Sequence, residues 1–153
     1  MDRIRLEGFP RSGNTYLSSI VTKSFQRAII DPFRHSAKNI TPETFVVIRQ
    51  PQIAISSFIY NFKITEAKSA EAWFIRFYET ALDIISPHHW ILFDDLISKP
   101  KAVLDHISQH SGMTYTANLS APKNSSPDFY PLLAFPKASR LFDRIRHDVK
   151  ANA

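Results

Sequence analysis

An octapeptide near the start of the chain has the outline of a phosphate-binding loop. Residues 8–15 read Gly-Phe-Pro-Arg-Ser-Gly-Asn-Thr, which matches the spacing G-x-x-x-x-G-x-[ST]. The backbone N–H groups of such a loop, at the start of a helix, bind phosphate or sulfate oxygens. Asn14 stands where ATP- and GTP-binding loops carry their lysine, and Arg11 is the cation that remains inside the loop. The octapeptide therefore predicts a phosphate-bearing donor other than ATP.

A second group of polar residues follows the most apolar segment of the chain. Arg49 comes directly after Thr-Phe-Val-Val-Ile, and Ser57 follows eight residues later. An arginine at the end of a strand makes charge-assisted hydrogen bonds to phosphate, and a serine in the next helix adds a hydroxyl to the same oxygens. The alternative is an ion pair between Arg49 and Asp94 or Asp95.

Apolar periodicity predicts the elements that would position these residues. The predicted strands cover residues 3–7, 28–30 (short and buried), 44–48 and 90–93. The predicted helices cover residues 15–27, 52–62, 66–85, 101–111 and 130–149, the last of them broken near Pro136. Residues 33–43 and 114–128 are expected to be connections.

Alternating strands and helices are typical of a parallel sheet with helices on both faces. The expected fold class is α/β, with three α/β/α layers, about four parallel strands and a nucleotide-binding loop of the P-loop type. Ligands of such sheets bind at the carboxyl ends of the strands, and Arg11, His35, Arg49 and Asp94 all fall there. We therefore expect these four residues to share one site.

The composition indicates one globular unit. The chain has 153 residues, 44% of them hydrophobic and 22% charged, which suits a single domain over residues 1–153. A formal net charge of +5 favours an anionic ligand without choosing between a nucleotide, RNA and an acidic membrane. The absence of cysteine excludes disulfides and thiolate zinc sites. No apolar run is long enough for a bilayer and no secretory signal is recognised, so a cytoplasmic location is expected.

Three segments, in this order, resemble motifs of the sulfotransferase family, whose donor is 3′-phosphoadenosine 5′-phosphosulfate (PAPS). Residues 9–16, Phe-Pro-Arg-Ser-Gly-Asn-Thr-Tyr, are similar to its 5′-phosphosulfate loop, Y-P-[KR]-S-G-T-T-W. Residues 46–51, continuing to Ser57 and Phe58, are similar to its 3′-phosphate motif. Residues 92–96, Leu-Phe-Asp-Asp-Leu, followed by Lys99 and Pro100, are similar to its Y-E-D-L…P segment.

The resemblance implies a role for each matching residue. Arg11 would lie beside the bridging oxygen of the phosphosulfate, and Tyr16 would lie near the adenine. Arg49 and Ser57 would hold the 3′-phosphate, with Ser56 in place of Ser57 if the alignment contains one gap. The residues expected to cradle the 5′-phosphate are Ser12, Gly13, Asn14 and Thr15.

The resemblance also implies a general base after the second strand, where His35 lies. A neutral histidine accepts the proton of an attacking hydroxyl, although His35 has the alternative of being a solvated loop residue. The implied reaction transfers a sulfuryl group from PAPS to a hydroxyl, or an amine, of a small-molecule or glycan acceptor, with His35 and Arg11 as catalytic residues. The product is 3′-phosphoadenosine 5′-phosphate (PAP). Neither a metal nor a nucleic acid is expected, and a homo-oligomer would help so short a chain complete its acceptor pocket.

The chain departs from the family pattern in three places. Asn14 replaces a threonine, and Ile53 occupies the place of an aspartate that follows the 3′-phosphate motif. The basic-glycine segment R-K-G of family members has no counterpart. Residues 123–126, Lys-Asn-Ser-Ser, are the candidates to replace its contacts.

Two other functions stay open. A P-loop nucleotide kinase or NTPase would use Arg11 in place of the missing lysine and hold magnesium with Asp31 or Asp94, each after an apolar strand. A non-catalytic domain with a nucleotide-binding fold would instead bind RNA or a protein. His106 and His110, four residues apart on a predicted helix, are expected to be surface residues rather than metal ligands.

Overall fold

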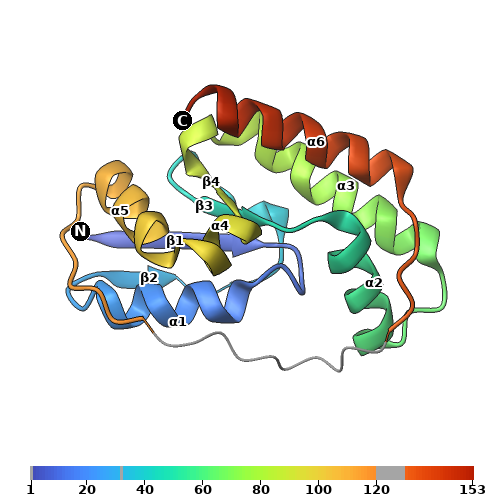
Figure 1. Cartoon of the computed structure of the whole chain (residues 1–153), viewed down its shortest axis with the longest axis horizontal. Helices are drawn as coiled ribbons and strands as arrows, with labels where there is room; N and C mark the ends of the chain where they lie inside the picture. Colours follow the sequence, from blue (N-terminus) through green and yellow to red (C-terminus); the bar gives the residue numbers. More distant parts are fainter. Residues whose placement is uncertain (1, 32, 120–129) are drawn as a thin grey trace.

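A parallel sheet forms the centre of the molecule (Figure 1). The computed structural model describes residues 2–31, 33–119 and 130–153. Over these residues the sheet has four strands, β1 (Arg3–Gly8), β2 (Ile29–Asp31), β3 (Phe45–Ile48) and β4 (Trp90–Leu92), in the order β2-β1-β3-β4. β2 pairs with one edge of β1, and β3 pairs with the other edge of β1. The strand order therefore reverses between β1 and β3. Open parallel sheets bind ligands at such a switch point.

Helices cover both faces of this sheet. In the described ranges they are α1 (Asn14–Ser24), α2 (Pro51–Phe62), α3 (Ala67–Ile84), α4 (Phe93–Ser98), α5 (Pro100–Ser111) and α6 (Pro136–Ala151), with 3-10 turns η1 (Ala37–Asn39) and η2 (Pro87–His89). Helices α1, α4 and α5 pack on one face, and α2, α3 and α6 pack on the other (Figure 1). The expected α/β class with three layers is confirmed.

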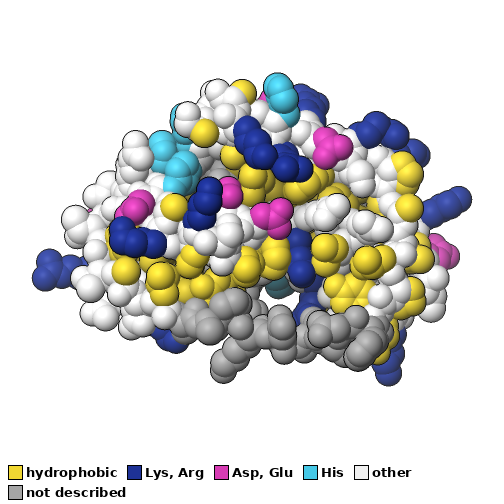
Figure 2. Space-filling model, in the orientation of Figure 1, with side chains coloured by type: hydrophobic (Ala, Val, Ile, Leu, Met, Phe, Trp, Pro, Cys, Tyr) yellow, Lys and Arg dark blue, Asp and Glu magenta, His cyan; other side chains and the backbone are white. Residues whose placement is uncertain are grey.

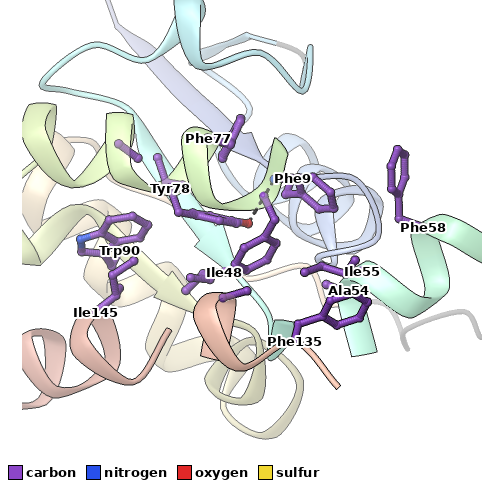
Figure 3. Close-up of a cluster of buried hydrophobic side chains, with 14 of the residues drawn as sticks. Phe9, Ile48, Ala54, Ile55, Phe58, Phe77, Tyr78, Trp90, Phe135 and Ile145 are labelled. Carbon is purple, nitrogen blue, oxygen red and sulfur yellow. Dashed lines mark hydrogen bonds between the residues drawn. The ribbon is translucent and has the colours of Figure 1, made fainter. Parts of the chain in front are cut away.

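Each face of the sheet has its own hydrophobic core. In β3, Val46 and Ile48 face α2, α3 and α6, whereas Phe45 and Val47 face α1, α4 and α5. All four residues of β3 are buried, as expected for a strand that is covered on both faces. Figure 3 shows the first of these cores, in which the hydroxyl of Tyr78 reaches toward Phe9, just after β1.

Two strands differ from the expectations. β2 was expected to be buried, but Ile29 is 45% exposed, because β2 is the edge of the described sheet and pairs with β1 alone. β4 ends at Leu92, and Phe93 begins α4 instead of ending the strand. Asp94 and Asp95 lie in the first turn of α4, where acidic side chains stabilise the start of a helix.

Proline and glycine set several helix ends. Pro51 and Pro100 occupy first helical positions, and Gly112 ends α5 with a left-handed backbone. The helix predicted over residues 130–149 is shorter at its start. The observed helix, α6, begins at Pro136, and residues 130–135 have no regular structure. A proline disfavours helical geometry at the residue before it, which accounts for the start of α6.

The long connections were expected to be irregular. Residues 33–43 contain the short 3-10 helix η1 and a turn at residues 42–43, and residues 114–119 have no regular structure. The rest of the expected loop, with the candidates at 123–126, lies outside the described residues. Among the helices of the described ranges, none has both the length and the apolar character needed to cross a membrane.

Candidate anion-binding site

The loop between β1 and α1 lies at the switch point of the sheet. Arg11 and Gly13 both have a left-handed backbone, with φ of 67° and 91°. Gly13 is the N-cap of α1, no side chain caps this end, and the first turn carries no acidic residue. The first N–H groups of α1 therefore keep the positive end of the helix dipole unopposed. This local structure favours an anion at the start of α1.

Both glycines of the octapeptide allow close packing that a side chain would prevent. A Cβ at Gly13 would lie 2.7 Å from the ring of Phe93. A Cβ at Gly8 would lie 2.7 Å from Cγ1 of Val47 and would collide with the side-chain oxygen of Asn14. The loop thus needs glycine at both positions for steric reasons, and Gly13 also needs it for its backbone angle.

Asn14, at the position of the lysine in ATP-binding loops, turns back into the loop. Its Nδ2 donates hydrogen bonds to the carbonyl oxygens of Gly8, at 3.2 Å, and Phe9, at 3.1 Å. The side-chain oxygen of Asn14 is buried and has no hydrogen-bond partner among the described residues. Asn14 therefore braces the loop instead of extending toward a phosphate as a lysine would.

The loop rests on Tyr78, a buried residue of α3. The Tyr78 hydroxyl donates to the carbonyl oxygen of Val47 at 2.9 Å and accepts from the N–H of Phe9 at 3.1 Å. Oγ of the buried Ser12 lies 3.3 Å from the same hydroxyl. Burial raises the pKa of Tyr78 far above its usual range, so the hydroxyl stays protonated. Because the Ser12 side chain faces this core, its backbone N–H is the group it can offer to a phosphate.

Arg11 and Ser57 meet although they come from different elements. Nε of Arg11 donates to Oγ of Ser57 at 3.1 Å, and Nδ2 of Asn61 donates to the same oxygen at 3.2 Å. The alternative residue, Ser56, faces another way, and its Oγ accepts the N–H of Leu133 at 2.9 Å. The geometry therefore favours Ser57 over Ser56 as the serine of this site.

Arg49 lies at the end of β3, beside the loop. Its Nη1 donates to the carbonyl oxygen of Arg11 at 3.2 Å, and its guanidinium carbon lies 4.1 Å from the centre of the Phe93 ring. Its Nε is buried without a partner in the described ranges. Burial lowers the pKa of Arg49, and the positive charge of Arg11 lowers it further, while Asp94 opposes this. The expected alternative, an ion pair with Asp94 or Asp95, is absent from the ion pairs between described residues.

His35 approaches the loop from the connection after β2. Its Nδ1 lies 2.9 Å from the carbonyl oxygen of Gly8, and its backbone has a left-handed φ of 54°. Its backbone N–H donates to Glu7 at 2.8 Å. The ring stacks on Phe33, with centroids 6.4 Å apart. His35 is therefore anchored at both its backbone and its ring.

A cavity of about 1080 Å³ opens at this end of the sheet, large enough for a nucleotide. Figure 2 shows a hollow in which basic side chains lie between hydrophobic ones. Predicted site residues that line the cavity are Arg11, Gly13, Asn14, Thr15, Tyr16, His35 and Arg49. Ser57 lies behind Arg11, which it contacts, and Ser12 faces the core. Asp94 is exposed in α4 and acts on Arg49 through its charge alone.

Three residues that shape the site were not predicted as site residues from the sequence. Phe93 reads as a strand residue and Tyr78 falls inside the helix predicted over residues 66–85, and only the fold brings them to the loop. Glu7 reads as a polar residue of an alternating strand, although it is 2% exposed. A buried acid directly before a glycine loop is a weak signal that could have been noticed.

The remaining candidates do not join the site. Both carboxylate oxygens of Asp31 contact arginines, Arg3 and Arg5, at the edge of the sheet. His106 and His110 cluster with His88, and no group of metal-ligating side chains is found among the described residues.

Two comparisons with known proteins identify no relative of this chain. A search of protein-family models and a search of curated protein sequences both find no match to this chain. The resemblance to sulfotransferases therefore rests on the three sequence motifs alone.

Proposed function

We propose that this chain is a sulfotransferase that uses PAPS as its donor. The observation that carries the proposal is the pair of Arg11 and Arg49. Both cations are partly buried, the charge of Arg11 lowers the pKa of Arg49, and neither arginine forms an ion pair with a carboxylate of the described residues. Like charges repel at short distance, and burial removes their solvation, so anionic groups bound beside the two arginines relieve both costs.

The donor would lie across the switch point. Its 5′-phosphosulfate would sit at the start of α1, where the N–H groups and Arg11 stabilise negative charge. Its 3′-phosphate would contact Arg49 and Ser57. Among the described residues, the Ser57 hydroxyl contacts two donors, Arg11 and Asn61, so its own hydrogen is left for an acceptor such as a phosphate oxygen.

The proposed reaction is an in-line transfer. The acceptor oxygen forms a bond to sulfur as the bond between sulfur and the 5′-phosphate oxygen breaks. The acceptor proton moves to Nε2 of His35, and the electron pair of the broken bond stays on PAP. Arg11 and the start of α1 stabilise the charge that develops on the leaving oxygen. Positioning and electrostatics would supply most of the catalysis.

The acceptor is proposed to be a small molecule or a glycan, and the enzyme to work in the cytoplasm without a metal. The kinase alternative has less support, because Asp31 is engaged with Arg3 and Arg5 and Asn14 does not take the place of the lysine. A basic binding domain would not need two cations beside an uncapped helix start.

A ligand comparison by thermal unfolding tests the proposal. PAP, adenosine 5′-monophosphate and ATP with magnesium are each added to the purified chain. A hundredfold excess of PAP over its Kd should raise Tm by about 5–10 °C. The monophosphate should act more weakly, because it lacks the 3′-phosphate. Stabilisation by ATP with magnesium alone would indicate a kinase, and salt-sensitive RNA binding without any nucleotide effect would indicate a binding domain.

A further inference from the structure

Glu7 is a buried carboxylate beside the loop that no step of the proposed reaction uses. It precedes Gly8 in β1 and is 2% exposed. Its Oε1 accepts the N–H groups of Gly8, at 3.0 Å, and His35, at 2.8 Å, and its Oε2 accepts that of Arg34, at 3.2 Å. Burial raises the pKa of Glu7, and the three N–H groups act against that rise. The carboxylate thus joins the phosphate-binding loop to the segment that carries the candidate base.

The segment around His35 depends on these bonds. Residues 33–36 have no regular secondary structure, so no helix or strand ladder holds them. His35 has a φ of 54°, a left-handed conformation that a residue with a Cβ adopts at a cost. Such conformations persist where the surroundings hold them in place, and they gather at functional sites. Glu7 provides that hold through two consecutive N–H groups, those of Arg34 and His35.

The same arrangement selects one tautomer of the imidazole. Nδ1 of His35 lies 2.9 Å from the carbonyl oxygen of Gly8, which can only accept a hydrogen bond. Nδ2 of Asn14 is also near, at 3.1 Å, but its two hydrogens have carbonyl acceptors in Gly8 and Phe9. Nδ1 therefore carries the proton, and Nε2 has a free lone pair, in a residue that lines the cavity.

We infer that Glu7 is a positioning residue, which holds the His35 imidazole with a basic Nε2 beside the phosphate-binding loop. It acts through the backbone of Arg34 and His35 and touches neither donor nor acceptor. The inference rests on the proposed function in one respect, since His35 is a base only if the chain transfers a group from a bound donor.

Imidazole nitrogen NMR on Glu7→Gln tests this role without any substrate. At about pH 8.5, where histidine is neutral, the unmodified protein should show a single Nδ1–H tautomer for His35, assigned by the loss of its signals in His35→Gln. A glutamine at position 7 presents an NH₂ group to at least one N–H donor, so it cannot hold all three. Glu7→Gln should therefore show both tautomers for His35.

The matched control is Glu79→Gln, the same chemical change at an exposed position of α3. It should leave the tautomer of His35 unchanged. PAP should bind Glu7→Gln within about twofold of its Kd for the unmodified protein, because the phosphate contacts are intact. A single Nδ1–H tautomer in Glu7→Gln, or a mixture in the unmodified protein, would overturn the inference.

Hydrogen exchange in the unmodified protein covers the case in which Glu7→Gln does not fold. The N–H groups of Arg34 and His35 should exchange at least about 100-fold more slowly than in a free peptide, although they lie outside helices and strands. Exchange at the free rate would overturn the inference. The two proposals fail separately: a fixed tautomer without PAP binding rejects the donor site alone, and PAP binding with mixed tautomers rejects the role of Glu7 alone.

Discussion

At the scale of single residues, the site has hydrogen-bond donors that no described residue accepts. The Ser57 hydroxyl receives two donors and keeps its hydrogen, and Nε of Arg49 is buried without a partner among the described residues. Unpaired buried donors cost free energy, so their presence at the cavity and directly behind its Arg11 wall indicates a missing acceptor. A phosphate, with several acceptor oxygens and negative charge, meets this need.

Arg49→Ala should separate binding from stability. A hydrogen bond to a charged group contributes about 1.5–3 kcal/mol, so the Kd for PAP should rise about 10- to 100-fold, measured by calorimetry. The free energy of unfolding should change by less than about 1 kcal/mol, because the lost contacts with Phe93 and with the carbonyl oxygen of Arg11 are offset by relief of a buried charge near Arg11. Arg76→Ala, an exposed arginine of α3, is the control and should change neither quantity. A large loss of stability with unchanged PAP binding would make Arg49 a structural residue.

Tyr78→Phe should destabilise the protein without adding a charge or a large void. The change removes the hydroxyl that Phe9, Ser12 and Val47 share and leaves buried polar groups unpaired. The free energy of unfolding should fall by about 1–3 kcal/mol, measured by urea denaturation. Tyr60→Phe removes a hydroxyl from an exposed ring of α2 and should have almost no effect. Equal effects of the two changes would refute the support that Tyr78 gives to the loop.

At the scale of elements, the site is a junction of β1, β3, α1 to α4 and the connection after β2. Three of the residues with positive φ in the described ranges, Arg11, Gly13 and His35, line its cavity. The other two, Lys63 and Gly112, are C-caps of α2 and α5, where a left-handed residue is ordinary. Costly backbone angles outside helix ends are thus confined to the site.

Gly13→Ala and Gly112→Ala form a matched pair that measures the contact between the loop and α4. Both glycines have a left-handed φ, but a Cβ at Gly112 would meet open space and one at Gly13 would meet Phe93. Gly112→Ala should lower the free energy of unfolding by about 1–2 kcal/mol, and Gly13→Ala should lower it by more. Phe93→Ala in the Gly13→Ala background should reduce that excess. Equal costs for the two glycines would show that α4 does not press on the loop.

The packing of η2 against α5 predicts a loss of stability in mild acid. Ring centroids of His88 and His110 lie 4.7 Å apart, and those of His106 and His110 lie 4.5 Å apart. Burial lowers the pKa of His89 and of His110 below the ordinary 6.5, and the neighbouring histidines lower that of His110 further. The unfolded chain then binds more protons near this pH, so the free energy of unfolding falls as pH drops through 6.5.

Thermal unfolding between about pH 7.5 and about pH 5.5 measures this loss. His110→Gln should flatten the decline in Tm, whereas His147→Gln, at an exposed position of α6, should keep it. The same decline in both variants would show that the histidine cluster does not cause it.

At the scale of the whole molecule, the features predicted correctly are those encoded in local sequence. The apolar run of β3, the glycine loop before α1 and Pro51 at the start of α2 each carry a strong local signal, and the strand-helix alternation implies the layers. The expectation of a single domain over residues 1–153 stays a prediction. The position of Arg11 and Arg49 at one edge of the sheet was also predictable from the sequence. Each arginine comes after a strand, β1 or β3, and parallel strands bring their carboxyl ends to one edge.

The features that were missed depend on tertiary contacts. Apolar composition does not tell an edge strand such as β2 from a buried one, because exposure depends on which strands are neighbours. Tyr78 follows a helical stripe of core residues, and its hydroxyl matters only because the loop passes over it. Phe93 changes from a strand end to the first residue of α4, which is what brings its ring under Arg49.

A crystal structure of the chain with PAP tests the central claim most directly. The 3′-phosphate should lie on the guanidinium of Arg49 and the hydroxyl of Ser57, and the 5′-phosphate at the start of α1 beside Arg11. Nε2 of His35 should face the position from which the sulfuryl group leaves. PAP bound outside this cavity, or an empty cavity at a saturating concentration of PAP, would show that Arg11 and Arg49 do not form a donor site.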